Sequence, residues 1–231
     1  MISRRPSQAC IITFMGPVGV GKSTHIQLLR DHLRSKKIRV VTTFIKSSHG
    51  LSYVLNRLLI APNIHEVSYR GRVTRVYSSK KIIKKLFPLY CLLDAISIAA
   101  KFFFTVYLPL RLGFTILIEE GLIMTLYTYN VSFPRFFGTE QETLPLLPRL
   151  LAYIKSKDHV NIVLDANSEE LDRRRKNRHY RQNELAEYID MQKEWLSQSD
   201  FGRTVLIGTT NESIARVHKN VLTTLKEYKC L

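Results

Sequence analysis

Short apolar runs alternate with longer amphipathic segments along most of the chain. Runs rich in β-branched and aromatic residues have the length and composition of buried strands, and they cover residues 10–15, 38–44, 115–118, 160–164 and 204–207. Apolar residues at helical spacing predict helices over residues 23–34, 51–59, 89–107, 146–155, 169–178, 183–197 and 211–228. This alternation indicates βαβ units and a mostly parallel sheet that helices cover on both faces.

The length and composition favour one compact domain. The chain has 231 residues, of which 45% are hydrophobic, and this fraction is enough for a packed core. No internal repeat and no linker-like segment interrupts it. We therefore expect a single α/β domain over residues 1–231, built as three layers (α/β/α) around a five-stranded sheet.

The most apolar stretch covers residues 89–118. Charged residues and a proline interrupt it at Asp94, Lys101, Pro109 and Arg111. No uninterrupted apolar run therefore reaches the ~18–20 residues that a spanning helix requires. A buried helix followed by a strand explains the stretch better, and no secretory signal is visible at the polar start of the chain. We expect no membrane span.

The number and spacing of the cysteines indicate the cellular compartment of the protein. Cys10, Cys91 and Cys230 are odd in number and far apart in the sequence, which argues against a disulfide framework and against a zinc site built on cysteine. Sparse cysteines fit a reducing environment. We therefore expect a cytoplasmic location.

The charge balance predicts a polyanionic partner. The chain has 35 Lys and Arg residues against 19 Asp and Glu residues, a formal net charge of +16. Nucleic acid, an acidic membrane surface and the phosphates of a nucleotide all fit this charge.

A glycine-rich turn after the first strand contains the clearest motif. Residues 16–23 read Gly-Pro-Val-Gly-Val-Gly-Lys-Ser and match the phosphate-binding pattern G-x-x-x-x-G-K-[ST] in full. Glycines allow backbone angles and a close approach that side chains would block, so successive N–H groups can hold phosphate oxygens at the start of the helix. An ordinary strand-to-helix turn is the alternative to this P-loop.

The P-loop predicts a nucleoside triphosphate ligand with Mg²⁺. Lys22 would reach the β- and γ-phosphate oxygens, and the Ser23 hydroxyl would bind Mg²⁺. No guanine-reading N-K-x-D element is present, which argues against a GTPase. We expect ATP to be bound by Gly16, Pro17, Val18, Gly19, Val20, Gly21, Lys22, Ser23 and Thr24.

Two carboxylates, Glu119 and Glu120, follow the apolar strand at residues 115–118. Strand carboxyl ends line the ligand crevice of an open α/β sheet. At this position Glu119 would hold Mg²⁺ through water or accept the proton of an acceptor hydroxyl. A solvated acidic pair after a strand is the alternative.

A cluster of arginines follows the fourth strand at residues 173, 174, 175, 178 and 181. Arg174 and Arg178 are four positions apart and so share one helix face. Guanidinium groups stabilise the charge that develops on a transferring phosphoryl group, and a mobile lid over about residues 172–184 would exclude water. A solvated basic helix and a nucleic-acid patch are the alternatives.

Together these motifs resemble the thymidylate kinase-like branch of the P-loop nucleoside monophosphate kinase family over most of the chain. The resemblance rests on the P-loop, on residues 106–113 with the strand that ends at Glu119, on residues 126–130, and on Leu164-Asp165 followed by the two arginines of the lid. In that family, ATP with Mg²⁺ donates a phosphate to a nucleotide. The resemblance implies a kinase whose catalytic residues are Lys22, Glu119, Arg174 and Arg178.

Three departures from the family fall on the acceptor side. Glu119-Glu120 and Asp94-Ala95 stand where the family has Asp-Arg pairs, and residues 44–50 replace its Arg-Glu-Pro-Gly. The arginines that grip an acceptor phosphate in the family are therefore missing here. The acceptor either lacks a phosphate or is bound by other residues, for which the candidates are Lys46, Arg70 and Arg72, with Tyr129 stacked on its base.

Two other classes of protein remain open. The net charge of +16 and the basic residues 70–85 fit a nucleic-acid-associated P-loop ATPase that uses ATP as a switch. A non-catalytic nucleotide-binding protein is a third hypothesis. In each case a homodimer is a further candidate assembly.

Overall fold

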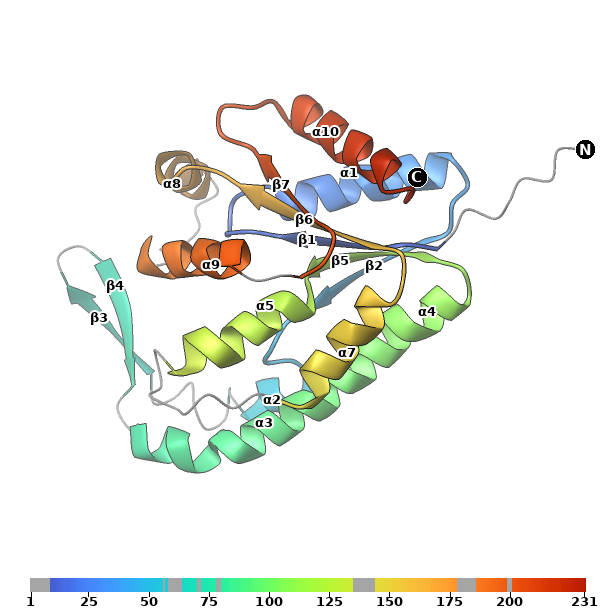
Figure 1. Cartoon of the computed structure of the whole chain (residues 1–231). Coiled ribbons are helices and arrows are strands. Elements are labelled where there is room, and N and C mark those ends of the chain that lie inside the picture. The colour runs from blue at the N-terminus through green and yellow to red at the C-terminus, as the bar shows by residue number, and fades with distance from the viewer. Residues whose placement is uncertain are drawn as a thin grey trace, which may run out of the picture.

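Five strands form one sheet in which every neighbouring pair is parallel (Figure 1). The computed structural model describes residues 9–55, 57, 64–69, 72–77, 80–134, 144–177, 186–198 and 201–231. The strand order is β2-β5-β1-β6-β7, with the bounds β1 Ile11–Met15, β2 Val40–Ile45, β5 Thr115–Glu120, β6 His159–Asp165 and β7 Thr204–Gly208. This confirms the predicted five-stranded α/β sheet.

Helices cover both faces of this sheet and form the outer layers of the expected α/β/α arrangement (Figure 1). α1 (Lys22–Ser35) and α10 (Ile214–Glu227) lie over one face. The other face carries α3 (Lys80–Phe102), α5 (Gly121–Tyr127), α7 (Leu146–Lys155) and α9 (Ala186–Gln198). The bounds of α7 are those that the sequence pattern predicts.

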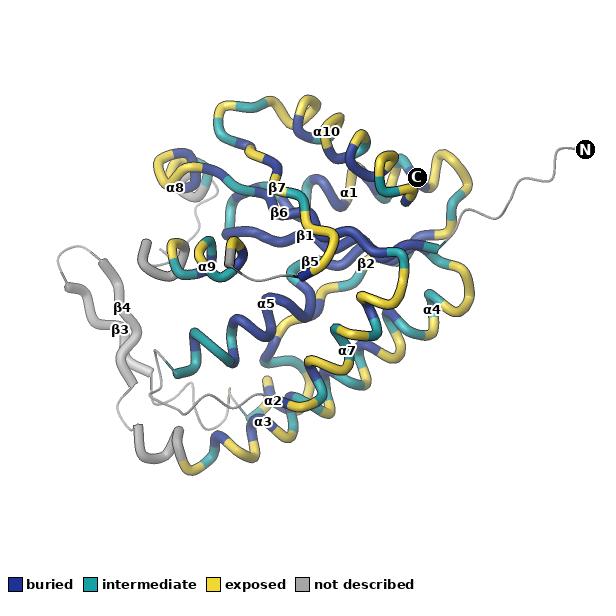
Figure 2. The backbone as a smooth tube through the Cα atoms, in the orientation of Figure 1, coloured by how far each residue is buried: buried dark blue, intermediate teal, exposed yellow. Residues whose placement is uncertain are grey.

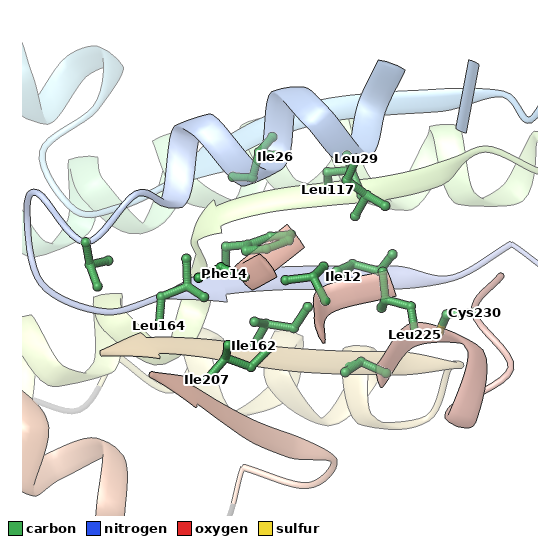
Figure 3. Close-up of a cluster of buried hydrophobic side chains, with 14 of the residues drawn as sticks. Ile12, Phe14, Ile26, Leu29, Leu117, Ile162, Leu164, Ile207, Leu225 and Cys230 are labelled. Atoms are coloured by element: carbon green, nitrogen blue, oxygen red, sulfur yellow. The ribbon is translucent and has the colours of Figure 1, made fainter. Parts of the chain in front are cut away.

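The residues of β1 point alternately into two apolar cores, as the twofold side-chain period of a strand requires. Ile12 and Phe14 pack with Leu29 of α1 and Leu225 of α10 (Figure 3). Ile11 packs with the helices of the opposite face. Every residue of β1 is buried, as expected for a parallel strand with helices on both sides.

The long apolar helix is less buried than the sequence analysis predicts. α3 runs into a π-helix, η3 (Phe103–Tyr107), and then into α4 (Leu108–Arg111). Figure 2 shows exposed positions along the described part of this helical segment. Leu92 of α3 is 58% exposed, and Phe104 of η3 is 65% exposed. Apolar residues surround this helix, so their period alone could not show which face the sheet would cover.

One helical segment in the described part of the chain, Lys85–Arg111, is long and apolar enough to cross a membrane by length and composition. The core helix of a globular protein passes the same test, but only 33% of its apolar window is buried here. That the chain has no membrane span therefore stays a prediction. The homodimer is likewise a prediction that the structure of this single chain does not test.

The polar segment before α3 contains a hairpin that the sequence analysis did not indicate. β3 (Ile64–Tyr69) pairs antiparallel with β4 (Arg72–Tyr77), and Tyr69 lies opposite Arg72. The hairpin follows the short helix α2 (Gly50–Leu55) in the chain. Its β-branched residues are separated by charged ones, so its pattern resembles a surface loop.

Cys10 and Cys230 form a disulfide, with 5.6 Å between their Cα atoms. The expectation that distant cysteines argue against disulfides was therefore wrong. These residues are 220 positions apart, but Cys10 immediately precedes β1 and Cys230 follows α10. Both are buried in the core between the sheet and α10, because the fold brings the two ends of the described chain together.

Candidate functional site

The turn between β1 and α1 is shaped by its glycines. Gly16, Gly19 and Gly21 have φ values of 129°, 92° and 105°, which residues with a side chain rarely adopt. A Cβ at Gly16 would also collide with the backbone oxygen of Leu164 at the end of β6. The turn leads directly into the N-terminus of α1, and the first N–H groups of a helix together with its dipole attract anions. The predicted ATP-binding residues 16–24 all lie in this turn and the first turn of α1.

Lys22 is the first residue of α1, and its side chain folds back over this turn. Its Nζ donates hydrogen bonds to the carbonyl oxygens of Gly16 at 2.6 Å and Pro17 at 3.2 Å. It also lies 3.7 Å from a carboxylate oxygen of Glu120, and only 6% of its side chain is exposed. A buried ammonium group needs such partners. They hold the charge of Lys22 at the P-loop, where it can meet phosphate oxygens.

Ser23 and Glu119 are in direct contact beside the P-loop. The Ser23 hydroxyl donates a hydrogen bond of 2.7 Å to Oε1 of Glu119. The sheet explains this contact, because Glu119 pairs with Phe14 of β1, just before the turn. A cavity of about 330 Å³ borders the pair and is also lined by Arg30 and Phe44. The two residues thus face space rather than packed side chains.

The contact between Ser23 and Glu119 fits Mg²⁺ chemically. Mg²⁺ prefers oxygen ligands and is commonly held by one or two protein groups together with water and substrate phosphates. A hydroxyl and a carboxylate oxygen side by side can fill two neighbouring positions around the ion. Within the described ranges no group of three or more His, Cys, Asp or Glu residues gathers, so water and phosphate would complete the shell.

Glu120 lies between two lysines. Its carboxylate oxygens are 3.7 Å from Nζ of Lys22 and 3.8 Å from Nζ of Lys46, which follows β2. Its backbone has φ 69° and ψ −59°, a conformation that costs a residue with a side chain roughly 1–3 kcal/mol. The ends of β1, β2 and β5 thus contribute charged groups to one small region.

Arg174, on α8 (Ser168–Asn177), contacts the P-loop, the loop that follows β7 and Glu170 of its own helix. Its guanidinium donates to the carbonyl oxygen of Val20 at 3.4 Å, and to the carbonyl and hydroxyl oxygens of Thr209 at 2.7 Å and 3.1 Å. A further bond of 2.7 Å reaches Glu170. The predicted arginine is therefore anchored beside the P-loop and beside the loop that follows β7.

Glu170 is a site residue that the sequence analysis missed. It accepts hydrogen bonds from Arg173 and Arg174. These bonds, those from Arg173 first, lower its pKa to about 2, although its partial desolvation opposes the shift. The spacing of Glu170 and Arg174, four positions apart on a helix, was the signal that could have found it.

The remaining lid prediction falls mostly on residues that are not described. Arg178 lies outside the described residues. Of residues 172–184 only 172–177 are described, and they form the end of α8. The lid therefore stays a prediction.

The structure places Tyr129 in the interior. Its ring is 1% exposed, and its hydroxyl donates a 2.6 Å hydrogen bond to Asp94. Burial, with the nearby Asp94 charge, raises the pKa of Tyr129. Asp94 is fully buried and also accepts bonds from the Ser52 hydroxyl at 2.6 Å and the Ser48 N–H at 2.8 Å. This position does not support the predicted stacking on an acceptor base.

The other predicted acceptor residues are less informative. Lys46 is 51% exposed and pairs with Glu120. Arg72 is the first residue of β4, and Arg70 lies outside the described residues. Of these three residues, Lys46 is placed at the described site by its contact with Glu120, and the roles of Arg70 and Arg72 stay predictions.

These features define the class of fold: an open parallel sheet with a glycine-rich P-loop after its central strand and charged groups at its carboxyl edge, as in P-loop nucleoside monophosphate kinases. Among solved structures the chain is similar to a thymidylate kinase from Ehrlichia chaffeensis, whose crystal structure was determined at 2.15 Å resolution. The TM-score is 0.53, and the match covers 96% of this chain and 100% of that chain at 17% identity.

This similarity confirms, for the fold, the resemblance found in the sequence. No protein-family model matches the chain. No curated protein matches it either.

Proposed function

We propose that this protein is an ATP- and Mg²⁺-dependent phosphotransferase that moves the γ-phosphate of ATP to a nucleotide or a related small acceptor. The observation that carries the proposal is the grouping of Lys22, Ser23 and Glu119 at a P-loop. The thymidylate kinase-like fold supports it, since the similar structure is that of a kinase.

Each residue has a defined task in this reaction. Lys22 would exchange its bonds to the loop carbonyls for bonds to the β- and γ-phosphate oxygens. Ser23 and Glu119 would hold Mg²⁺, which when bound neutralises charge on the phosphates. Arg174, anchored beside the loop, would add positive charge near the transferring group. Phosphoryl transfer depends mainly on positioning of the reactants and on stabilisation of charge. The residues named here are of the types that would provide both.

Replacement of Lys22 tests the proposal. Calorimetry with Mg²⁺ should detect ATP binding to the native protein, and a panel of nucleotides, nucleosides and sugars should include one that stimulates ADP release. Lys22→Ala should abolish this turnover. Lys36→Ala is the matched control, because Lys36 lies exposed just after the far end of α1. ATP binding without any acceptor-stimulated turnover would contradict the proposal.

A nucleic-acid-associated ATPase is the second candidate, favoured by the net charge of +16. This function predicts DNA or RNA binding that falls steeply with salt, together with hydrolysis that nucleic acid stimulates. Stimulation by nucleic acid without phosphate transfer to any small acceptor would favour it over the kinase. A non-catalytic role would leave association with a partner intact in Lys22→Ala.

A further inference from the structure

We infer that the protein has a second binding site, remote from the P-loop, for a small molecule that carries several negative charges, such as a polyphosphate. The site is a pocket of about 700 Å³, compared with about 330 Å³ for the cavity beside Ser23. We call it the amino-edge pocket, and the lining residues that carry the inference are Arg111, Tyr153, Lys155, Lys157, Asp158 and Arg203. The inference does not depend on the proposed kinase function.

The amino-edge pocket lies where the strands of the sheet begin. Arg111 ends α4 shortly before β5, Lys157 lies two residues before β6, and Arg203 directly precedes β7. Because β5, β1, β6 and β7 are consecutive and parallel, their starts meet at one edge of the sheet (Figure 1). The P-loop follows the other end of β1, and a strand of five residues spans roughly 17 Å. A ligand in this pocket would therefore leave the P-loop free.

The lining of the pocket has an excess of positive charge. Four of its residues are cationic, and one, Asp158, is acidic. Arg111, Lys157 and Arg203 are exposed, and within the described part of the chain none of the three forms an ion pair. A cation at the end of a helix is favourable by itself, which accounts for Arg111 and Lys155. Lys157 and Arg203 lie outside the helices, so this explanation does not apply to them.

Tyr153 adds a hydrogen-bond donor to these charges. Its hydroxyl is buried and has no hydrogen-bond partner among the described residues, an arrangement that folded proteins mostly avoid. Burial and the nearby Tyr107 raise the pKa of Tyr153, although the charge of Arg111 opposes the rise, so the hydroxyl is protonated at neutral pH. Nζ of Lys157 lies 5.1 Å from the centre of the Tyr153 ring. An anionic oxygen held by these two cations would supply the missing acceptor.

The shape of the cationic group favours a small ligand over a nucleic-acid strand. The cations come from three separate segments and line one pocket, and its volume is within the range of small-molecule sites. A site for a single strand instead follows the backbone along a groove for several nucleotides. Guanidinium groups bind phosphate oxygens through paired N–H donors. The pocket therefore suits a compact molecule with two or more phosphate groups.

Calorimetry with inorganic tripolyphosphate tests the inference, in a buffer of ~0.15 M salt that screens non-specific attraction between exposed charges. The double variant Lys157→Ala/Arg203→Ala should bind tripolyphosphate at the amino-edge pocket at least ~10-fold more weakly than the native protein. Lys219→Ala/Lys226→Ala removes the same charge from exposed positions of α10 and should retain the site. Lys22→Ala should also retain it, which separates this site from the P-loop.

The inference would be overturned if the pocket variant bound tripolyphosphate as the native protein does, or if the α10 variant lost as much affinity as the pocket variant. The second result would assign the binding to net charge alone. A single-stranded RNA that binds the native protein but not the pocket variant, with no tripolyphosphate bound by either protein at this site, would overturn the class of ligand. None of these results bears on phosphate transfer at the P-loop, so the proposed function and this site fail or stand separately.

Discussion

The Ser23 hydroxyl donates a 2.7 Å hydrogen bond to the Glu119 carboxylate, although the two residues are 96 positions apart in the chain. Ser23 follows β1 and Glu119 lies at the end of β5, the parallel neighbour of β1. The contact is thus a direct product of strand order. It joins the motif that would bind phosphate to the strand end that would bind metal.

Glu119→Gln should raise the Mg²⁺ concentration needed for half-maximal turnover at least tenfold, because an amide oxygen is a weaker ligand for a hard cation than a carboxylate. Titration of ADP release with Mg²⁺ measures this change. Asp31→Asn, on the exposed side of α1, should leave the titration unchanged. An unaltered Mg²⁺ dependence of Glu119→Gln would remove Glu119 from the metal site.

Arg174→Ala should weaken ATP binding about tenfold or more, since it removes the guanidinium that reaches Val20 and Thr209. Calorimetry with Mg²⁺-ATP measures the effect. Arg173→Ala is a close control, because Arg173 pairs with the same Glu170 but is 66% exposed. If both variants bind ATP equally well, Arg174 only stabilises α8.

Reduction of the Cys10–Cys230 disulfide should destabilise the protein. The bond closes a loop across 220 positions, and the chain-entropy relation gives a stabilisation of about 5 kcal/mol for such a loop. Urea unfolding with and without reductant measures the difference. Cys230→Ala should be as stable with reductant as without it. If the free energy of unfolding of the native protein is the same with and without reductant, the prediction is wrong.

Acid should destabilise the contact between α1 and α10 through His25. Burial lowers the pKa of His25 to about 4, and the nearby His218 and Arg174 act in the same direction. The unfolded chain, with its pKa near 6.5, therefore binds protons first as the pH falls. The free energy of unfolding should drop by about 2 kcal/mol between pH 7 and pH 5 on account of His25.

His25→Gln tests this dependence, because it removes the titrating group and should flatten the pH profile by that amount. Urea unfolding at pH 7 and pH 5 is the measurement. His218 and His32 also have lowered pKa values from burial, so a smaller loss of stability should persist in the variant. An identical slope in both proteins would show that His25 does not titrate in this range.

The local elements were largely predictable from the sequence. The five strands and α7 follow from apolar periodicity, and the P-loop follows from glycines at positions where only glycine fits the backbone. The hairpin β3–β4 was not predictable in this way, because charged residues interrupt its apolar pattern. The exposed face of α3 was also undetermined, since its sequence is apolar on several sides.

The candidate site likewise has a part that was predictable from the sequence and a part that was not. Sequence alone determined the glycine-rich turn of residues 16–23, because its residues are adjacent and its geometry is set by their own backbone preferences. Only the tertiary structure decided that Cys10 meets Cys230, that Tyr129 bonds to buried Asp94, and that Glu120 lies between Lys22 and Lys46. Such contacts depend on strand order and helix packing, which arise from the whole chain and leave no trace in local spacing.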